Sequence, residues 1–277
     1  MGLGINHNIL ALTARRNIWN TQQQLDTAVT RLSSGLRINH AWDDPAGLAI
    51  SERFRAQIAS LEEAERNANR NINLLQTAEG GLSVIDEKLV RLRALAVESS
   101  NGDLLAADRT ALNVEFQQLS SEISRIANVT NYNGLYLLDG SYSSSGIQFH
   151  IGTHNVSNED YYSVTFNNMT ASSLGLNSVT ITSTTNAQAA IGSIDVAINS
   201  KDTERTRLGS YVERLQGTIQ QLQIAHENST SSEATIRDAD IAAEMSQFVR
   251  SQILMQSGVA MLAQANMLPQ ILGGLIS

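Results

Sequence analysis

The sequence contains no cysteine, which excludes disulfides, thiolate metal sites and a cysteine nucleophile. Proline is nearly absent, with Pro45 and Pro269 as its two occurrences, and aromatic residues make up 5% of the chain. Because proline interrupts helices, this composition favours long helices over a loop-rich sandwich. The net charge of −8 gives no electrostatic support for nucleic-acid binding, so a nucleic-acid partner is not expected.

Charge is missing from both ends of the chain. Residues 251–277 carry no ionisable side chain, and in residues 1–14 the terminal amine is accompanied by His7 alone. A membrane span, a buried core and an assembly interface are three possible explanations. A membrane helix needs about 20 mostly apolar residues. The tail is instead interrupted by glutamine, serine, asparagine and proline, from Gln252 to Gln270, so membrane insertion is not expected.

Apolar residues recur at both ends with the spacing of a heptad. We call these residues the assembly stripe, and it comprises Ile5, Ile9 and Leu12 near one end and Ile241, Met245, Phe248, Met255, Val259 and Leu262 near the other. In the second group the steps alternate between four and three residues, with Gln252 in one slot. Stripes of this kind pack helices against helices.

Between the ends, the periodicity changes twice. Helical spacing is expected over 45–99, after an Asp44-Pro45 helix start, and over about 104–129. Residues 131–185 read as a small β region, with Asn-Gly and Asp-Gly turn signals over 131–140 and strands at 146–152, 161–166 and, as an edge, 178–184. Helical spacing returns at about Ala187, and residues 226–240 are expected to form a polar joint before the last helix.

This order predicts a mainly α fold: a long antiparallel helical bundle or coiled coil with a small β-hairpin region inserted mid-chain. The economical way to bury the stripes is to lay the returning C-terminal helices along the N-terminal ones. A hairpin of two helices cannot bury every face, so the ends are expected to order fully only against other copies of the chain. The charge-free ends are therefore interpreted as an assembly interface.

Residues that could carry chemistry are few. His150 and His154 have the spacing of a metal pair on a helix, but they fall in an expected strand and loop, so surface histidines are the alternative. The glycine pairs lack a nucleotide-binding pattern, and no nucleophile–base constellation is visible. The sequence predicts no enzyme, no metal and no cofactor.

Four stretches of the sequence resemble a known family. RLSSGLRINHAWDDPAGLAISERFRAQI (31–58) is similar to the N-terminal segment of bacterial flagellin, and so are LVRLRALAVESSNG (89–102) and EFQQLSSEISRIANVTNYNG (115–134). RDADIAAEMSQFVRSQILMQSGVAMLAQANMLPQILGGL (237–275) is similar to its C-terminal segment. The resemblance covers about 1–140 and 187–277.

The resemblance implies a subunit that polymerises into the extracellular flagellar filament for swimming motility. It implies a terminal coiled-coil core domain made of 1–42 and 237–277, and a bundle domain made of 43–186 and 187–236, with the variable outer domains absent. It also implies export without a cleaved signal peptide, with an export chaperone, the secretion apparatus and hook-associated junction and cap proteins as partners beside the chain itself. The alternative is a hook–filament junction protein of the same superfamily.

Residues 89–119 also resemble the flagellin surface that Toll-like receptor 5 recognises. Arg91, Leu95 and Glu115 match the key positions of that pattern. The sequence departs from it at Val90, Ala94 and Leu119. Arg91 and Leu95 are four residues apart and share a helix face, and the next helix can fold back to place Glu115 beside them, so one patch of the three residues is expected. This patch is expected to serve subunit packing, receptor recognition or both.

Overall fold

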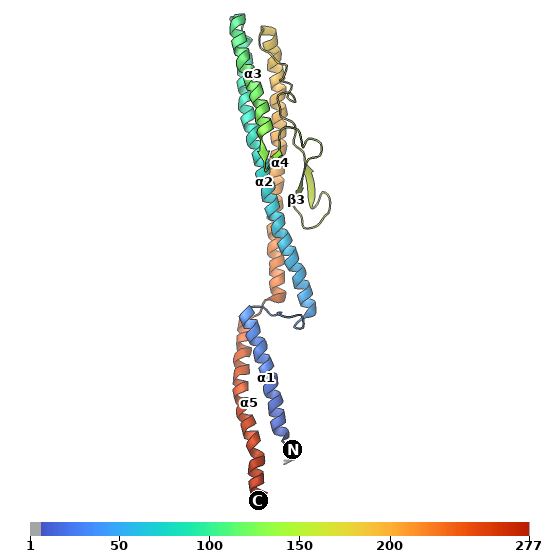
Figure 1. Cartoon of the computed structure of the whole chain (residues 1–277), viewed down its shortest axis with the longest axis vertical. Helices are drawn as coiled ribbons and strands as arrows, with labels where there is room; N and C mark the ends of the chain where they lie inside the picture. The colour runs from blue at the N-terminus through green and yellow to red at the C-terminus, as the bar shows by residue number, and fades with distance from the viewer. Residues whose placement is uncertain (1–6, 277) are drawn as a thin grey trace. The chain divides into compact units, whose positions relative to one another are not determined.

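The computed structural model describes residues 7–276, and the side chains of residues 7–267. Its described part contains helices α1 (Ile9–Ser34), α2 (Pro45–Ser99), α3 (Ala106–Val129), α4 (Thr184–Arg237) and α5 (Ile241–Ile276) (Figure 1). Two compact units divide the chain. The terminal unit comprises Met1–Ile58 and Asn228–Ser277, and the bundle unit comprises Ala59–Glu227.

Local sequence signals set the ends of the helices. Asp44 caps α2, because its Oδ1 accepts the backbone N–H of Gly47 at 2.9 Å, and Pro45 occupies the first helical position. The helix then continues for 55 residues to Ser99, as the proline-free stretch predicts. Helix α1 ends at Gly35, whose φ of 74° is the left-handed conformation that glycine adopts most easily.

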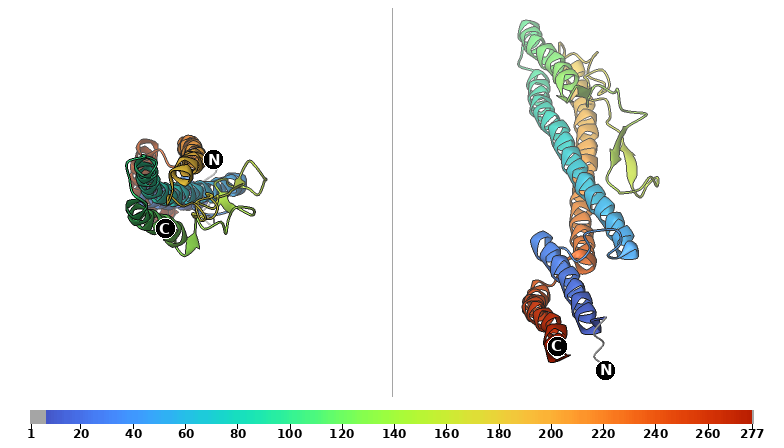
Figure 2. Two further views of the ribbon diagram at one scale, coloured as in Figure 1. Left: turned by 90° about the horizontal axis from the view of Figure 1, so that it is seen from above. Right: turned by 60° about the horizontal axis from the view of Figure 1, so that its bottom comes forward.

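The bundle unit is built on α2, α3 and α4, which lie side by side (Figures 1 and 2). One continuous core joins them to the β region. Its fully buried side chains include Leu75, Leu82 and Leu89 of α2, Phe116 and Ile123 of α3, and Ile194, Leu208 and Leu215 of α4. The prediction of a mainly α, antiparallel bundle is confirmed.

Two short hairpins form the β region. Strands β1 (Asn131–Tyr132) and β2 (Leu135–Tyr136) pair across Asn133 and Gly134, whose φ angles are 51° and 82°. Both angles are positive, as in the tight hairpin turn that Asn-Gly predicts. Strands β3 (Ile147–His150) and β4 (Tyr161–Val164) pair antiparallel, with Phe149 opposite Tyr162.

The expected edge strand at 178–184 is wrong. Residues 178–183 have no regular structure and run along the helices. Asn113 Oδ1 accepts the backbone N–H of Ile181 at 3.0 Å, and Ser99 Oγ donates to the carbonyl of Ile181 at 2.5 Å. Helix side chains therefore satisfy the backbone groups that a neighbouring strand would otherwise pair.

The expected polar joint at 226–240 is also wrong in extent. Helix α4 continues to Arg237, and three residues separate it from α5. Contacts within the terminal unit stabilise this polar last part of α4: Ser51 Oγ donates to Glu233 at 3.1 Å, and Arg237 lies 3.3 Å from Glu52. Asp240 caps α5 by accepting the N–H groups of Ala242 and Ala243.

Lys201 shows why a cation can occupy an inward position of α4. Its side chain is 2% exposed, and its Nζ lies 2.5 Å from both Asp86 and Asp202. The neighbouring Glu204 is fully buried and accepts from Arg207 and Asn167. Each of these buried charges is paired and hydrogen-bonded, as burial in a low dielectric requires.

Candidate assembly interface

In the terminal unit, α1 and α5 lie against each other as an antiparallel pair (Figure 1). The start of α1 meets the second half of α5, since the amide of Asn8, the N-cap of α1, donates to the carbonyl of Ala265 at 2.7 Å. The less exposed positions of α5 follow a heptad, with Phe248, Met255 and Leu262 alternating with Glu244, Ser251, Gly258 and Ala265. On α1 they are Ala11, Ala14, Ile18, Thr21, Leu25, Ala28, Arg31 and Leu32.

Small residues let these two helices approach closely. A Cβ added to Gly258 would lie 2.9 Å from Cγ1 of Ile18. Ala28 and Ser251 are almost completely buried, and Ala265 is buried as well. Large and small residues thus alternate along the contact, which is the spacing that interlocking side chains require.

The assembly stripe does not lie on one face of this pair. Phe248, Met255 and Leu262 are half-buried along the contact between the helices. The other described members are exposed: Ile9, Leu12, Ile241, Met245 and Val259. Ile5 lies outside the described residues. The apolar spacing therefore identifies Phe248, Met255 and Leu262 as contact residues of α5. It misses the small residues Ser251, Gly258 and Ala265, which occupy the alternate positions of the same contact.

Large apolar side chains cover the outside of the pair. Trp19 is 63% exposed and Val259 is 55% exposed. Other exposed members on these helices are Ile9, Leu10, Leu12, Val29, Ile241, Met245, Val249, Ile253, Leu254, Met261 and Met267. Monomeric proteins rarely expose so many apolar side chains on neighbouring helices, and such surfaces mark association sites.

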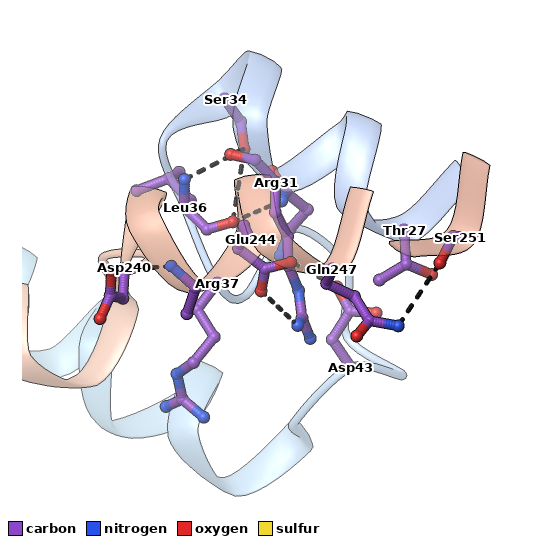
Figure 3. Close-up of polar contacts among 12 residues, drawn as sticks. Thr27, Arg31, Ser34, Leu36, Arg37, Asp43, Asp240, Glu244, Gln247 and Ser251 are labelled. Atoms are coloured by element: carbon purple, nitrogen blue, oxygen red, sulfur yellow. Dashed lines mark hydrogen bonds and ion pairs between the residues drawn. The ribbon is translucent and has the colours of Figure 1, made fainter. Parts of the chain in front are cut away.

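Backbone pairing fixes the register of the two helices where α1 ends and α5 begins. Leu36 and Asp238 form an antiparallel bridge. The N–H of Arg37 donates to the carbonyl of Arg237 at 2.7 Å, and that of Ala239 donates to the carbonyl of Gly35 at 2.9 Å. Just beyond, Arg31 pairs with Glu244 at 2.8 Å (Figure 3). These contacts hold one end of the helix pair.

The second predicted surface lies in the bundle unit. Arg91 of α2 and Glu115 of α3 form an ion pair with N–O distance 2.7 Å, and both side chains are about half exposed. Leu95 has no exposed surface and belongs to the core. The expectation of one patch of three residues is therefore corrected: Arg91 and Glu115 are at the surface together, and Leu95 lies beneath it.

The two histidines lie in different parts of the β region. His150 ends β3 and stacks against Tyr161, whereas His154 lies in the following loop. Asp160 organises that loop by accepting the backbone N–H groups of Val156 and His154, and these bonds lower the pKa of its carboxyl. In the described part of the chain, no three His, Cys, Asp or Glu side chains are grouped to hold a metal. Within the same residues, none of the helices combines the length and hydropathy needed to span a bilayer.

Two family models match the sequence. The bacterial flagellin N-terminal helical region matches residues 5–143, and the bacterial flagellin C-terminal helical region matches residues 191–276. These ranges contain α1 to α3 and most of α4 with α5. A flagellin of Halalkalibacterium halodurans is 45% identical over 96% of this chain and 97% of its own length. A 33 kDa flagellar filament core protein of Treponema phagedenis is 40% identical over the same shares.

A solved structure shares the fold at lower identity. A chain from Vibrio parahaemolyticus, described as a flagellar hook-associated protein, aligns with a TM-score of 0.55 and 15% identity. The alignment covers 71% of this chain and 100% of the other. At this identity the likeness shows a common helical architecture.

Proposed function

The chain belongs to the bacterial flagellin family, and we propose that the exposed apolar surface of α1 and α5 is where its copies meet in the flagellar filament. As a flagellin it is a structural protein rather than an enzyme, and it serves as the subunit of an extracellular filament.

The single observation that carries the proposal is the exposure of Val259, Trp19 and their apolar neighbours on both helices. Each fully buried apolar side chain of this size contributes about 1.5–3 kcal/mol. In the isolated chain these residues stay in water, so contact with further copies supplies the burial that the helix pair lacks. In this proposal the residues of the assembly stripe have two roles. Phe248, Met255 and Leu262 hold α1 and α5 together, and the residues that contact other subunits are Ile9, Leu12, Ile241, Met245 and Val259.

We further propose the domain limits and partners that the family resemblance implies. In this proposal residues 1–42 and 237–277 form the core domain and 43–236 form the bundle domain, whereas the terminal unit of the structure also includes 43–58 and 228–236. Export proceeds without a cleaved signal peptide, with an export chaperone and the secretion apparatus. Hook-associated junction and cap proteins meet the filament at its two ends.

Electron microscopy of the purified protein after addition of filament seeds tests the main proposal. We expect long tubes whose mass grows with subunit concentration above a threshold. A protein that stays monomeric over a wide range of salt and concentration would contradict it. The alternative, a hook–filament junction protein, predicts few copies per filament, so measuring the copy number in isolated flagella separates the two.

We also propose that Toll-like receptor 5 recognises the surface formed by Arg91 and Glu115. Their ion pair joins α2 and α3, and Arg is a frequent anchor of protein interfaces. Because Leu95 is buried, its contribution is to support the helix surface. Free subunit should activate receptor reporter cells more strongly than filament, and Arg91→Ala should weaken the response. A silent free subunit would leave filament packing as the remaining role.

A further inference from the structure

A small groove on the terminal unit combines negative charge with an exposed tryptophan. It is lined by Asp26 and Thr30 of α1 and by His40, Trp42 and Asp43 of the loop before α2, among others. Its volume is about 140 Å³. Pockets for small organic ligands measure roughly 300–1,000 Å³, so this groove suits a single side chain.

The groove has an uncompensated negative charge. Asp26 accepts a hydrogen bond from the neutral amide of Gln22 at 2.8 Å, and among the described residues no cation pairs with it. One oxygen of Asp43 accepts the backbone N–H groups of Asn39 and His40. These two bonds lower the pKa of Asp43, which keeps its carboxylate ionised. Arg31 also lines the groove and attracts Asp43, but its guanidinium pairs with Glu244 at 2.8 Å, so with Asp26 and Asp43 the groove keeps a net negative charge.

Trp42 is the most exposed large apolar side chain among the described residues, at 78%. It stacks on His40 with ring centroids 4.4 Å apart, which holds one face of the indole in place. A fixed, exposed indole beside carboxylates is the arrangement that binds a guanidinium, through stacking on the ring and ion pairing with the acid.

The same unit carries arginines that have no carboxylate partner. Among its described residues these are Arg15, Arg16, Arg53 and Arg250. Arg15 and Arg16 are adjacent, and they line a hollow on α1 together with the exposed Leu12 and Trp19. Arg15 and Arg16 are therefore unpaired cations that lie beside exposed apolar side chains.

We propose that Arg16, with Arg15 beside it, inserts into the groove of Asp26, Trp42 and Asp43 on a second copy of the chain. The contact cannot form within one copy, because ten residues of α1 separate Arg16 from Asp26, about 15 Å along a rigid helix. It joins two different surfaces, the arginine pair of one copy and the groove of the next, so the first copy still has a free groove and the second a free arginine pair. Contacts of this heterologous kind propagate into open helical polymers rather than closed dimers.

This inference rests on the proposed polymerisation, and a charge exchange tests it. Asp26→Arg and Arg16→Asp should each raise the critical concentration for seeded polymerisation by about tenfold. The double variant Asp26→Arg with Arg16→Asp should return to within about threefold of the starting protein, because the pair is restored with reversed sign. Asp103→Arg, which makes the same charge change on an exposed loop of the bundle unit, should leave the critical concentration unchanged.

Cysteine crosslinking gives an independent measurement, since the chain has no cysteine of its own. Chains with Asp26→Cys and chains with Arg16→Cys are polymerised together with excess unmodified protein, so that filaments form even if the variants assemble poorly. As controls, each variant is also polymerised separately with excess unmodified protein. Oxidation of mixed filaments should give a disulfide-linked dimer that neither variant gives alone. Filaments without this dimer, or a double charge variant no better than the single ones, would overturn the inference and leave the filament function standing. Unmodified protein that forms no filament would overturn the proposed function instead.

Discussion

In the bundle unit Leu75, Phe116 and Leu215 have no exposed surface, whereas in the terminal unit the large side chains of Trp19 and Val259 remain mostly in water. The two units are built from similar helices. They differ in how many elements cover each helix: α2, α3, α4 and the β region share one core, but α1 and α5 have only each other along most of their length. The first unit is therefore complete in one chain, and the second has the exposed apolar surface that we propose is covered by other copies.

Removing residues 251–277 should give the largest difference in effect between the two units. The truncation deletes most of α5, including Gly258 and Val259, and leaves every residue of the bundle core in place. We expect seeded polymerisation to be abolished, while the thermal unfolding of the bundle unit is unchanged. Sedimentation measures the first property, and circular dichroism follows the second. Filaments formed by the truncated protein would show that α5 is not needed for assembly.

Leu215→Asp should instead unfold the bundle unit. Leu215 has no exposed surface and belongs to the continuous core, so the variant loses apolar contacts and buries an unpaired carboxylate. We expect the free energy of unfolding to fall by about 4–5 kcal/mol or more. Urea denaturation followed by circular dichroism measures it. Gln216→Asp, at the exposed neighbouring position, is the control and should change stability by less than about 0.5 kcal/mol.

Val259→Asp should leave the monomer folded and block its assembly. The side chain is 55% exposed in the single chain, so the carboxylate is hydrated there. At a subunit contact it would be buried without a partner, which costs roughly 3–5 kcal/mol, or a rise of about two to four orders of magnitude in critical concentration.

Ser257→Asp is the matched control for that variant. It adds the same charge two residues away, on the row of α5 that Arg250 and Gln264 also occupy at seven-residue intervals. Its critical concentration should change little. Normal filament growth by Val259→Asp, or equal inhibition by both variants, would show that the row of Val259 is not the buried one.

Much of the fold could be predicted because helix signals along this chain are strong and uninterrupted. The proline-capped start of α2 and its end at Ser99 are confirmed, as are the Asn-Gly hairpin and the pairing of the first helix with the last. The two errors have a common cause. At 178–184 and 226–237 the side chains of distant helices, such as Asn113 and Ser51, decide the backbone structure, and single-sequence patterns do not contain them.

The candidate interface was predictable in location and not in detail. Missing charge identified the two ends, but apolar spacing ranked Val259 above Gly258, although glycine makes the close contact with Ile18. Hydrophobicity measures the tendency to leave water, whereas close helix packing requires small volume at alternate positions. Serine, glycine and alanine at 251, 258 and 265 carry this second signal in their seven-residue spacing. Leu95 shows the reverse case, since its match to a surface pattern did not reveal that it is buried.

The smallest expected effect comes from adding one methyl group to a glycine in each unit. Gly217 of α4 has no neighbouring atom within 4 Å of an added Cβ, so Gly217→Ala should stabilise the bundle unit by about 0.5–1 kcal/mol through helix propensity alone. Gly258→Ala gains the same propensity, but its Cβ would lie 2.9 Å from Ile18. Overpacking costs of about 1–3 kcal/mol should cancel or exceed the gain and loosen the α1–α5 pair.

Hydrogen exchange of the α1 and α5 amides measures the stability of that pair, and thermal unfolding measures that of the bundle. If Gly258→Ala protects the terminal amides as Gly217→Ala protects the bundle, α1 and α5 do not pack closely at this point in the free subunit. The helix pair would then form only on assembly, and the contrast between a complete unit and a half-complete one would become a contrast between a folded unit and one that folds upon polymerisation. If exchange instead accelerates on both helices near Gly258, the pair is already closed before assembly and offers a preformed apolar surface to the next subunit.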